Sequence, residues 1–267
     1  MVTSKKQLTM KKMFFIAALG LVSMTVSAQS TSVKESLENV SFGVRLGGNL
    51  SSTAGNECTA SYHKGSTTYS FDAKNMVGFQ VGVIADLPFP NVANLYIQPG
   101  VYYTTKGAKS EGNVSNKVWN IEASANYIEV PILASYRLPV GKDMNVHFNA
   151  GPYVAFGVGG KLTQKATEHV ISWLLIEKED GDYDFEDIKP GHHDGGLKTF
   201  GDKGVLNRLD FGLNLGAGFN YGPFYAGAGY EFSLVNVGKT IELGEYKQEF
   251  NLKNSNIFLH LGYNFSL

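Results

Sequence analysis

Apolar and polar residues alternate with a period of two in eight separate stretches of the chain. In the first stretch, Phe42, Val44 and Leu46 share one face of the expected strand. Gly43 and Arg45 occupy the opposite face. Successive side chains of a β-strand point to opposite faces, so each stretch predicts a strand with one apolar and one polar face. The eight stretches are residues 42–50, 77–85, 95–104, 127–137, 146–157, 208–219, 224–234 and 256–267.

Short and long connections take turns between these stretches. The short connections, such as residues 87–94 around Pro88 and Pro90, have the composition of turns. The long connections are polar and cover residues 51–75, 107–125, 161–206 and 236–254. Short periplasmic turns, long external loops and an even number of strands are typical of bacterial outer-membrane barrels. We therefore predict an all-β fold, an eight-stranded antiparallel transmembrane up-and-down β-barrel with short periplasmic turns and long external loops.

Two other barrels are consistent with part of this pattern. A soluble lipocalin shares the strand count, but it places its apolar residues inside and its polar residues in water. Here the polar face is rich in Gly and poor in Lys and Glu, and the apolar face continues to Phe265 and Leu267, which favours lipid on the outside. A ten-stranded barrel stays open, because residues 169–177 are apolar enough for one arm of an added hairpin. The sequence shows no convincing partner for that arm.

The N-terminal residues predict export from the cytoplasm. Lys11 and Lys12 precede an apolar run at residues 13–22, and small residues at 26–28 are typical of a cleavage site. The run is shorter than the ~20 residues that a membrane-spanning helix needs. We expect a signal peptide at residues 1–28, a short periplasmic segment at 29–41 and the barrel at 42–267, located in the cell outer membrane. The start of translation is either Met1 or Met10.

The inward faces of the predicted strands carry charges of both signs. The interior of an eight-stranded barrel is only wide enough for side chains to fill it, so we expect these groups to pair and close the lumen. Arg45 and Glu129 are one candidate pair. A narrow proton or solute path is the alternative. The predicted structural network contains Arg45, Gln80, Gln98, Glu129, Arg137, His147, Arg208, Asp210, Glu231 and His260.

The composition excludes several kinds of chemistry. The one Cys, Cys58, excludes a disulfide framework and a Cys-rich zinc module, and a lone thiol is no candidate nucleophile. A formal net charge of −1 gives no electrostatic footprint for nucleic acid. The 14 Tyr and 17 Phe in 267 residues fit strands better than helices. Composition therefore supports the barrel and leaves its activity open.

An acidic run in the third long connection superficially resembles a calcium loop. Asp180, Asp182 and Asp184 have the right spacing. Phe185, however, stands where the turn Gly is required, and Gly191 stands where the bidentate Glu is required. We expect a solvated acidic loop and no metal site.

Catalysis has little support in the sequence. Ser172 and His169 lie in the third long connection, and only Glu168 is near them in sequence. The adjacent His192 and His193 lie near glycines, which is typical of a loop rather than a metal site. We expect no enzymatic activity and no cofactor, and an enzyme acting at the barrel rim is the less favoured alternative.

Several phrases of the sequence resemble a known family. Residues 96–103, YIQPGVYY, and 127–136, YIEVPILASY, are similar to the Bacteroidota outer-membrane beta-barrel domain family, often called PorT-like or porin-family proteins. The phrases at 149–153, 210–214 and 262–265 fit the same pattern, so the resemblance covers roughly residues 42–267. Pro99, Pro131 and Pro152 interrupt three of the predicted strands, where each removes a ladder donor.

The resemblance implies where the protein acts and leaves its ligand open. It implies outer-membrane lipid around the barrel and a carboxy-terminal strand, with Phe265 and Leu267, that the barrel-assembly machinery recognises. We expect a monomer with a structural or surface-interaction role through its external loops, whose external ligand or protein partner the sequence does not name. A narrow porin-like channel or a secretion-associated factor are the alternatives.

Overall fold

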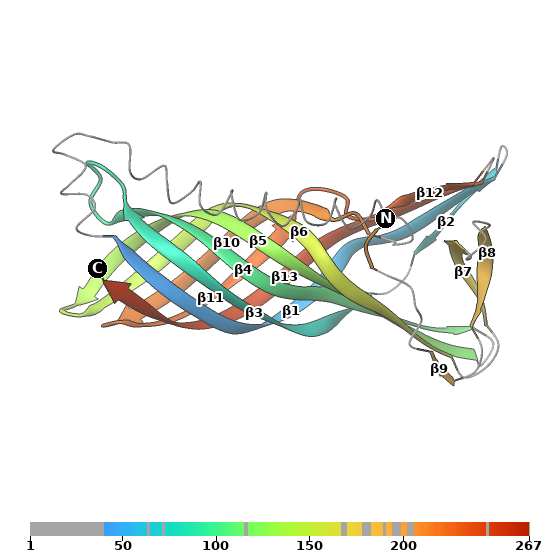
Figure 1. Cartoon of the computed structure of the whole chain (residues 1–267), viewed down its shortest axis with the longest axis horizontal. Helices are drawn as coiled ribbons and strands as arrows, with labels where there is room; N and C mark the ends of the chain where they lie inside the picture. The colour runs from blue at the N-terminus through green and yellow to red at the C-terminus, as the bar shows by residue number, and fades with distance from the viewer. Residues whose placement is uncertain are drawn as a thin grey trace, which may run out of the picture. The chain divides into compact units, whose positions relative to one another are not determined.

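The computed structural model describes residues 40–62, 65–70, 73–114, 117–166, 170–177, 183–188, 191–193, 199–201, 206–243 and 246–266. Eight antiparallel strands close into a ring, in which each pairs with the next and the last pairs with the first (Figure 1). The predicted eight-stranded antiparallel barrel is confirmed. Its strands are β1 (Ser41–Tyr62), β3 (Ala73–Pro88), β4 (Leu95–Val114), β5 (Lys117–Gly141), β6 (Met144–Ala166), β10 (Leu209–Tyr221), β11 (Phe224–Ser233) and β13 (Tyr246–Ser266).

The wall of the barrel has an apolar outer face and a polar inner face. Where β1 pairs with β13, Leu46 faces Leu261, and these side chains are 62% and 69% exposed. The next residue back along β1, Arg45, is buried. Lipid offers no hydrogen bonds, and a ring of strands satisfies its backbone groups internally because it has no edge. The exposed apolar side chains are therefore the lipid-facing surface.

Strands continue through much of the sequence expected to be long loops. On the external side β1 pairs with β13 as far as Tyr62 and Tyr246, and β4 pairs with β5 as far as Val114 and Lys117. Beyond the membrane both faces of a strand meet water, so no apolar face is needed and the period-two pattern disappears. This is why the alternation ended before the strands did.

Shorter strands extend these external hairpins. β2 (Gly65–Ser70) pairs with β1, β12 (Thr240–Leu243) pairs with β13, and β9 (Gly191–His193) pairs with β6. Each adds one strand beside a barrel strand where that strand leaves the membrane. The external side of the barrel is therefore built largely of hairpins.

The third long connection also contains a separate two-stranded sheet. It is formed by β7 (Val170–Glu177) and β8 (Tyr183–Ile188). The expectation that the apolar arm at residues 169–177 has no convincing partner was wrong, because β8 pairs with β7. β8 was missed because its apolar residues stand among the acidic residues of the acidic run. The hairpin does not join the barrel ring, so the barrel has eight strands and not ten.

Pro99, Pro131 and Pro152, which interrupt the predicted strands, lie on the neighbouring strands β4, β5 and β6. Pro99 is paired with Ile132, and Pro131 is paired with Tyr153. Within the described strands, Gly100 and Val101 of β4 are unpaired with β5, although the register is the same on both sides of the gap. The ladder therefore accommodates the missing N–H groups by a local interruption without a shift in register.

The described part of the chain contains no helix long and apolar enough to cross a membrane. The predicted signal peptide at residues 1–28, the segment at 29–39 and Leu267 lie outside the described residues.

Candidate functional site

The lumen is the part of the molecule where polar chemistry concentrates. At the periplasmic end, a buried carboxylate on β3 collects three partners. Arg137 Nη2 lies 2.6 Å from Asp86 Oδ1, and Gln98 Nε2 donates to the same oxygen at 2.7 Å. Ser41 Oγ donates to Asp86 Oδ2 at 3.2 Å. We call Asp86, Gln98 and Arg137 the periplasmic cluster; it ties β3, β4 and β5 together.

Arg45 has different partners from those the sequence suggested. Its Nη2 atom donates to Asn264 Oδ1 at 2.8 Å, and its guanidinium lies 4.1 Å from the centre of the Tyr225 ring. Among the described residues no ion pair joins Arg45 to Glu129, so the expected pairing was wrong. A guanidinium on an aromatic face is stabilised by the ring quadrupole, which gives this buried cation a partner other than a carboxylate.

Lys106 is the cation that Glu129 contacts. Its Nζ atom lies 2.6 Å from Glu129 Oε2 and 3.1 Å from Glu231 Oε2, and all three side chains are at most 3% exposed. Asn214 and Asn256 each donate to Glu231 at 2.9 Å. We call these five residues the central cluster. Buried charges persist when they are paired and hydrogen-bonded, and this arrangement supplies both.

Sequence reasoning missed Lys106 although a signal was present. Gln98, Tyr102 and Thr104 mark the inward positions of β4, and two residues further along that parity is Lys106. The predicted strand ended at residue 104, because residues 105–107 have the composition of a loop. The same alternation applies to β3. Ile84 faces inward, and the next inward position, two residues later, is Asp86.

Asp210 lies between the central cluster and the external mouth. Ser233 Oγ donates to it at 2.6 Å, Asn254 Nδ2 at 2.8 Å and the Tyr153 hydroxyl at 3.5 Å. Among the described residues no cation lies within ion-pair distance of this carboxylate. Hydrogen bonds from three strands therefore replace a contacting cation.

The remaining predicted network residues divide between the interior and the rim. Gln80 and His260 are buried and share a hydrogen bond of 2.6 Å, and His147 is buried against the ring of Tyr225. Arg208 is a correction, because it is exposed just before β10 begins. Its Nη1 atom donates to the carbonyl of Gly157 at 2.7 Å. The inward parity does not apply there, since residue 208 precedes the strand.

A cluster of buried apolar side chains, which we call the apolar cap, lies at the external end of the barrel. Phe200 follows β9 and precedes β10 in the sequence. Its ring packs edge-on against the ring of Tyr127, with the two ring centres 5.4 Å apart. Gly157 makes this possible, because a Cβ at that position would overlap the Phe200 ring. Thr199 Oγ1 donates to the carbonyl of Ser124 at 2.7 Å. The buried residues of this apolar cap are Ala125, Tyr127, Tyr153, Ala155, Phe200, Leu206, Val237, Phe250 and Leu252.

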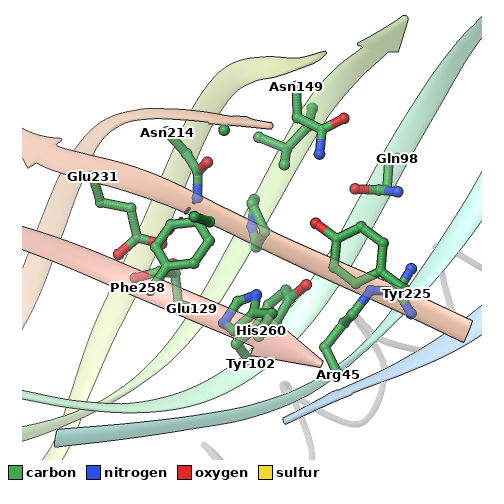
Figure 2. A pocket seen from close by; sticks show the side chains of 14 residues that line it. Arg45, Gln98, Tyr102, Glu129, Asn149, Asn214, Tyr225, Glu231, Phe258 and His260 are labelled. Carbon is green, nitrogen blue, oxygen red and sulfur yellow. Dashed lines mark hydrogen bonds between the residues drawn. The ribbon is translucent and has the colours of Figure 1, made fainter. Parts of the chain in front are cut away.

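Little space is left between the periplasmic and central clusters. The cavity there measures about 20 Å³, room for one water molecule (Figure 2). Side chains from the barrel strands fill the rest of this part of the lumen. The arrangement binds strands to one another and leaves no room in this cavity for a larger solute.

Comparison with known families decides the identity of this barrel. The family described as outer membrane protein beta-barrel domain matches residues 27–238. The chain belongs to this family. Its place is accordingly the outer membrane, where the apolar outer face meets lipid and the external hairpins lie outside it. No curated protein matches the sequence at a significant level.

The chain is similar to several solved structures of outer-membrane barrels at low sequence identity. OprG from Pseudomonas aeruginosa is 11% identical, with 86% of this chain and 97% of that chain covered and a TM-score of 0.45. Ail of Yersinia pestis, solved with the heparin analogue sucrose octasulfate, is 12% identical, with coverage of 85% and 99% and a TM-score of 0.35. Neisserial surface protein A is 13% identical, with coverage of 84% and 97% and a TM-score of 0.31.

Some residues considered from the sequence of this outer-membrane barrel are not described. His169, Glu168, Asp180 and Asp182 lie outside the described residues, as do the side chains of Cys58, Ser172, Asp184, His192 and His193. In the part of the chain that is described, no group of three or more His, Cys, Asp or Glu side chains has an arrangement that could hold a metal ion.

Proposed function

We propose that this barrel serves at the cell surface through its external hairpins and does not conduct solutes through its lumen. The observation that carries the proposal is the apolar cap, in which Phe200 and Leu206 are buried among Tyr127, Val237 and Phe250. Removing apolar side chains from water is favourable, so the cap is stable when closed.

The polar lumen below the cap supports the same proposal. Lys106, Glu129 and Glu231 form ion pairs across the interior, and the cavity next to them has room for about one water molecule. A passing solute would need to break these pairs and leave buried charges without partners. The energy for that is large, so a narrow channel is the less favoured alternative.

The external hairpins supply a rigid platform for binding. β1 and β13 continue as a ladder to Tyr62 and Tyr246, with β2 and β12 alongside. Thr59 and Thr68 share a hydrogen bond of 3.0 Å across β1 and β2, on the exposed part of this ladder. Binding residues are disproportionately found on external segments held by a rigid scaffold.

Two further assignments belong to this proposal. The narrower membership in the PorT-like, porin-family group of the Bacteroidota rests on the phrases at residues 96–103 and 127–136. Export through the inner membrane rests on the signal-peptide pattern at residues 1–28. Because binding alone would account for a surface role, we propose no enzymatic activity. If the barrel acts in secretion, we propose that the same external hairpins bind a partner protein.

The test combines conductance with adhesion. Purified barrel is reconstituted in planar bilayers, and cells that display it are assayed for adhesion to immobilised mucin, collagen and sibling cells. A matched variant lacks residues 170–193, which removes the β7–β8 hairpin and β9 but keeps Thr199, Phe200 and Leu206 of the mouth. We expect no stable conductance steps from either protein and weaker adhesion by the variant. Ohmic single-channel steps from the unmodified barrel, or adhesion equal to that of cells without the protein on every surface, would overturn the proposal.

A further inference from the structure

One polar cavity inside the lumen lies between the periplasmic and central clusters (Figure 2). Asn149 of β6 and Asn214 of β10 line it on one side, and Arg45 and Tyr225 line it on another. β6 and β10 are paired, with Asn149 opposite Gly216 and Asn214 opposite Gly151, so the two amides are diagonal neighbours on the inner face.

The amide of Asn214 has a fixed orientation. Its Nδ2 atom donates to Glu231 Oε1 at 2.9 Å, and a carboxylate oxygen can only accept from it, so Oδ1 points the other way. Oδ1 accepts no hydrogen bond from the described residues, although the residue is only 4% exposed. A buried acceptor without a donor is unfavourable, and native interiors provide a partner for nearly all such groups.

Asn149 presents a second unsatisfied group to the same cavity. It is 8% exposed, and its Oδ1 atom likewise accepts no hydrogen bond from the described residues. Two amides on adjacent strands therefore need a ligand of the size of one water molecule, since the cavity measures about 20 Å³.

We propose that this cavity is a binding site for one ordered water molecule that joins Asn149 and Asn214. Water donates to the Oδ1 atom of Asn214, and it satisfies the Asn149 amide whichever end of that amide faces it, because water both donates and accepts. The two amides supply two hydrogen bonds, which lies within the range of two to four that buried waters make.

A monovalent cation fits the surrounding charges less well. The guanidinium of Arg45 lines the cavity, and a second cation beside it would be repelled. The two carboxylates on the wall, Glu129 and Glu231, are already 2.6 and 3.1 Å from the ammonium of Lys106. A neutral water molecule therefore fits the site better than a cation.

The water extends the central cluster to Asn149. Glu231 reaches Asn214 by a direct hydrogen bond, and Asn214 reaches Asn149 through the water. The connection therefore runs from Glu231 on β11 through Asn214 on β10 to Asn149 on β6. The water is thus a structural part of the filled lumen.

The test is water-to-protein magnetisation transfer by NMR on the refolded, isotope-labelled barrel in nanodiscs. We expect NOE and ROE cross-peaks of opposite sign between water and the side-chain amide protons of Asn214, the signature of a bound rather than a diffusing water. Asn256 is the internal control, because its amide is satisfied by Asn49 and Glu231, and it should show no such peak. An absent peak at Asn214 would mean a dry cavity and would overturn the proposal.

Two variants distinguish a bound water from other sources of the same NMR signal. Tyr225→Phe removes the hydroxyl whose proton could relay exchange with water, and the Asn214 peak should remain. Asn149→Leu fills the cavity with a larger apolar side chain, and the peak should be lost while the backbone amide spectrum stays that of a folded barrel. A peak that persists in Asn149→Leu, that disappears in Tyr225→Phe, or that depends on replacing sodium chloride by choline chloride would contradict a water at this site.

Discussion

Replacing Lys106 by methionine should destabilise the barrel more than any exposed charge change. The substitution keeps an unbranched side chain of similar length but removes the ammonium that contacts Glu129 at 2.6 Å and Glu231 at 3.1 Å. Both carboxylates are buried, and breaking a buried ion pair by removing one partner costs about 3 to 5 kcal/mol. We therefore expect Lys106→Met to lower the free energy of unfolding by that amount.

Removing one carboxylate should be less harmful than removing the shared cation. In Glu129→Gln the amide oxygen can still accept from Lys106, and Glu231 remains as its counter-ion. The expected loss is about 1.5 to 3 kcal/mol, the value of a hydrogen bond to a charged group. The triple variant Lys106→Met, Glu129→Gln, Glu231→Gln should recover much of the loss, because the net value of a buried ion pair is small once desolvation is included.

The assay is a urea titration of the refolded barrel in lipid vesicles, followed by its heat-modifiable migration in gels. Lys109→Met is the matched control on the same strand, since Lys109 and Glu122 form an ion pair of 2.9 Å with side chains 35% and 34% exposed. An exposed pair contributes about 0 to 1 kcal/mol, so this control should be nearly neutral. Equal midpoints for Lys106→Met and Lys109→Met would refute the assignment of Lys106 as the central counter-ion.

Three further outcomes can be measured, two with the same preparation and one in cells. Phe200→Ala should cost about 3 to 5 kcal/mol in the urea titration, as for a core phenylalanine, whereas Phe89→Ala in the exposed periplasmic turn should change stability by less than about 0.5 kcal/mol. Comparable losses in the two would argue against the apolar cap. Asp86→Asn should cost about 1 to 3 kcal/mol, because Arg137 loses its carboxylate while Gln98 keeps an acceptor; an unchanged urea midpoint would count against the periplasmic cluster. Deleting residues 265–267 should block assembly in cells, and a normal heat-modifiable band from that truncated chain would contradict a carboxy-terminal recognition signal.

The alternation of side chains was sufficient to predict the barrel wall. Leu46 and Arg45 are adjacent in sequence and lie on opposite faces of β1, one toward lipid and one in the lumen. The same reasoning predicted that Glu129 and Glu231 face inward, because a one-residue error in register would move every side chain to the wrong face. Face and strand order are local properties of an antiparallel meander, so the sequence carries them directly.

Partners inside the lumen required the three-dimensional structure. Lys106 and Glu231 are 125 positions apart in the printed sequence, and the parity of two strands says that both point inward but not at which height. The stagger between strands sets that height, and it places Arg45 beside Asn264 and Tyr225 instead of beside Glu129. Charge counting therefore identified a paired interior without identifying the pairs.

The sequence by itself determined the class of the fold, the lipid-facing side chains and most of the polar groups of the lumen. Only the tertiary structure decided which side chains form the apolar cap at the external end of the barrel. Phe200 and Leu206 belong to a connection without periodicity, and they are buried because Gly157 leaves room for an aromatic ring and because Val237 and Phe250 come from a different hairpin. Contacts of this kind depend on which distant segments of the chain meet in space. A local pattern of apolar and polar residues does not determine this.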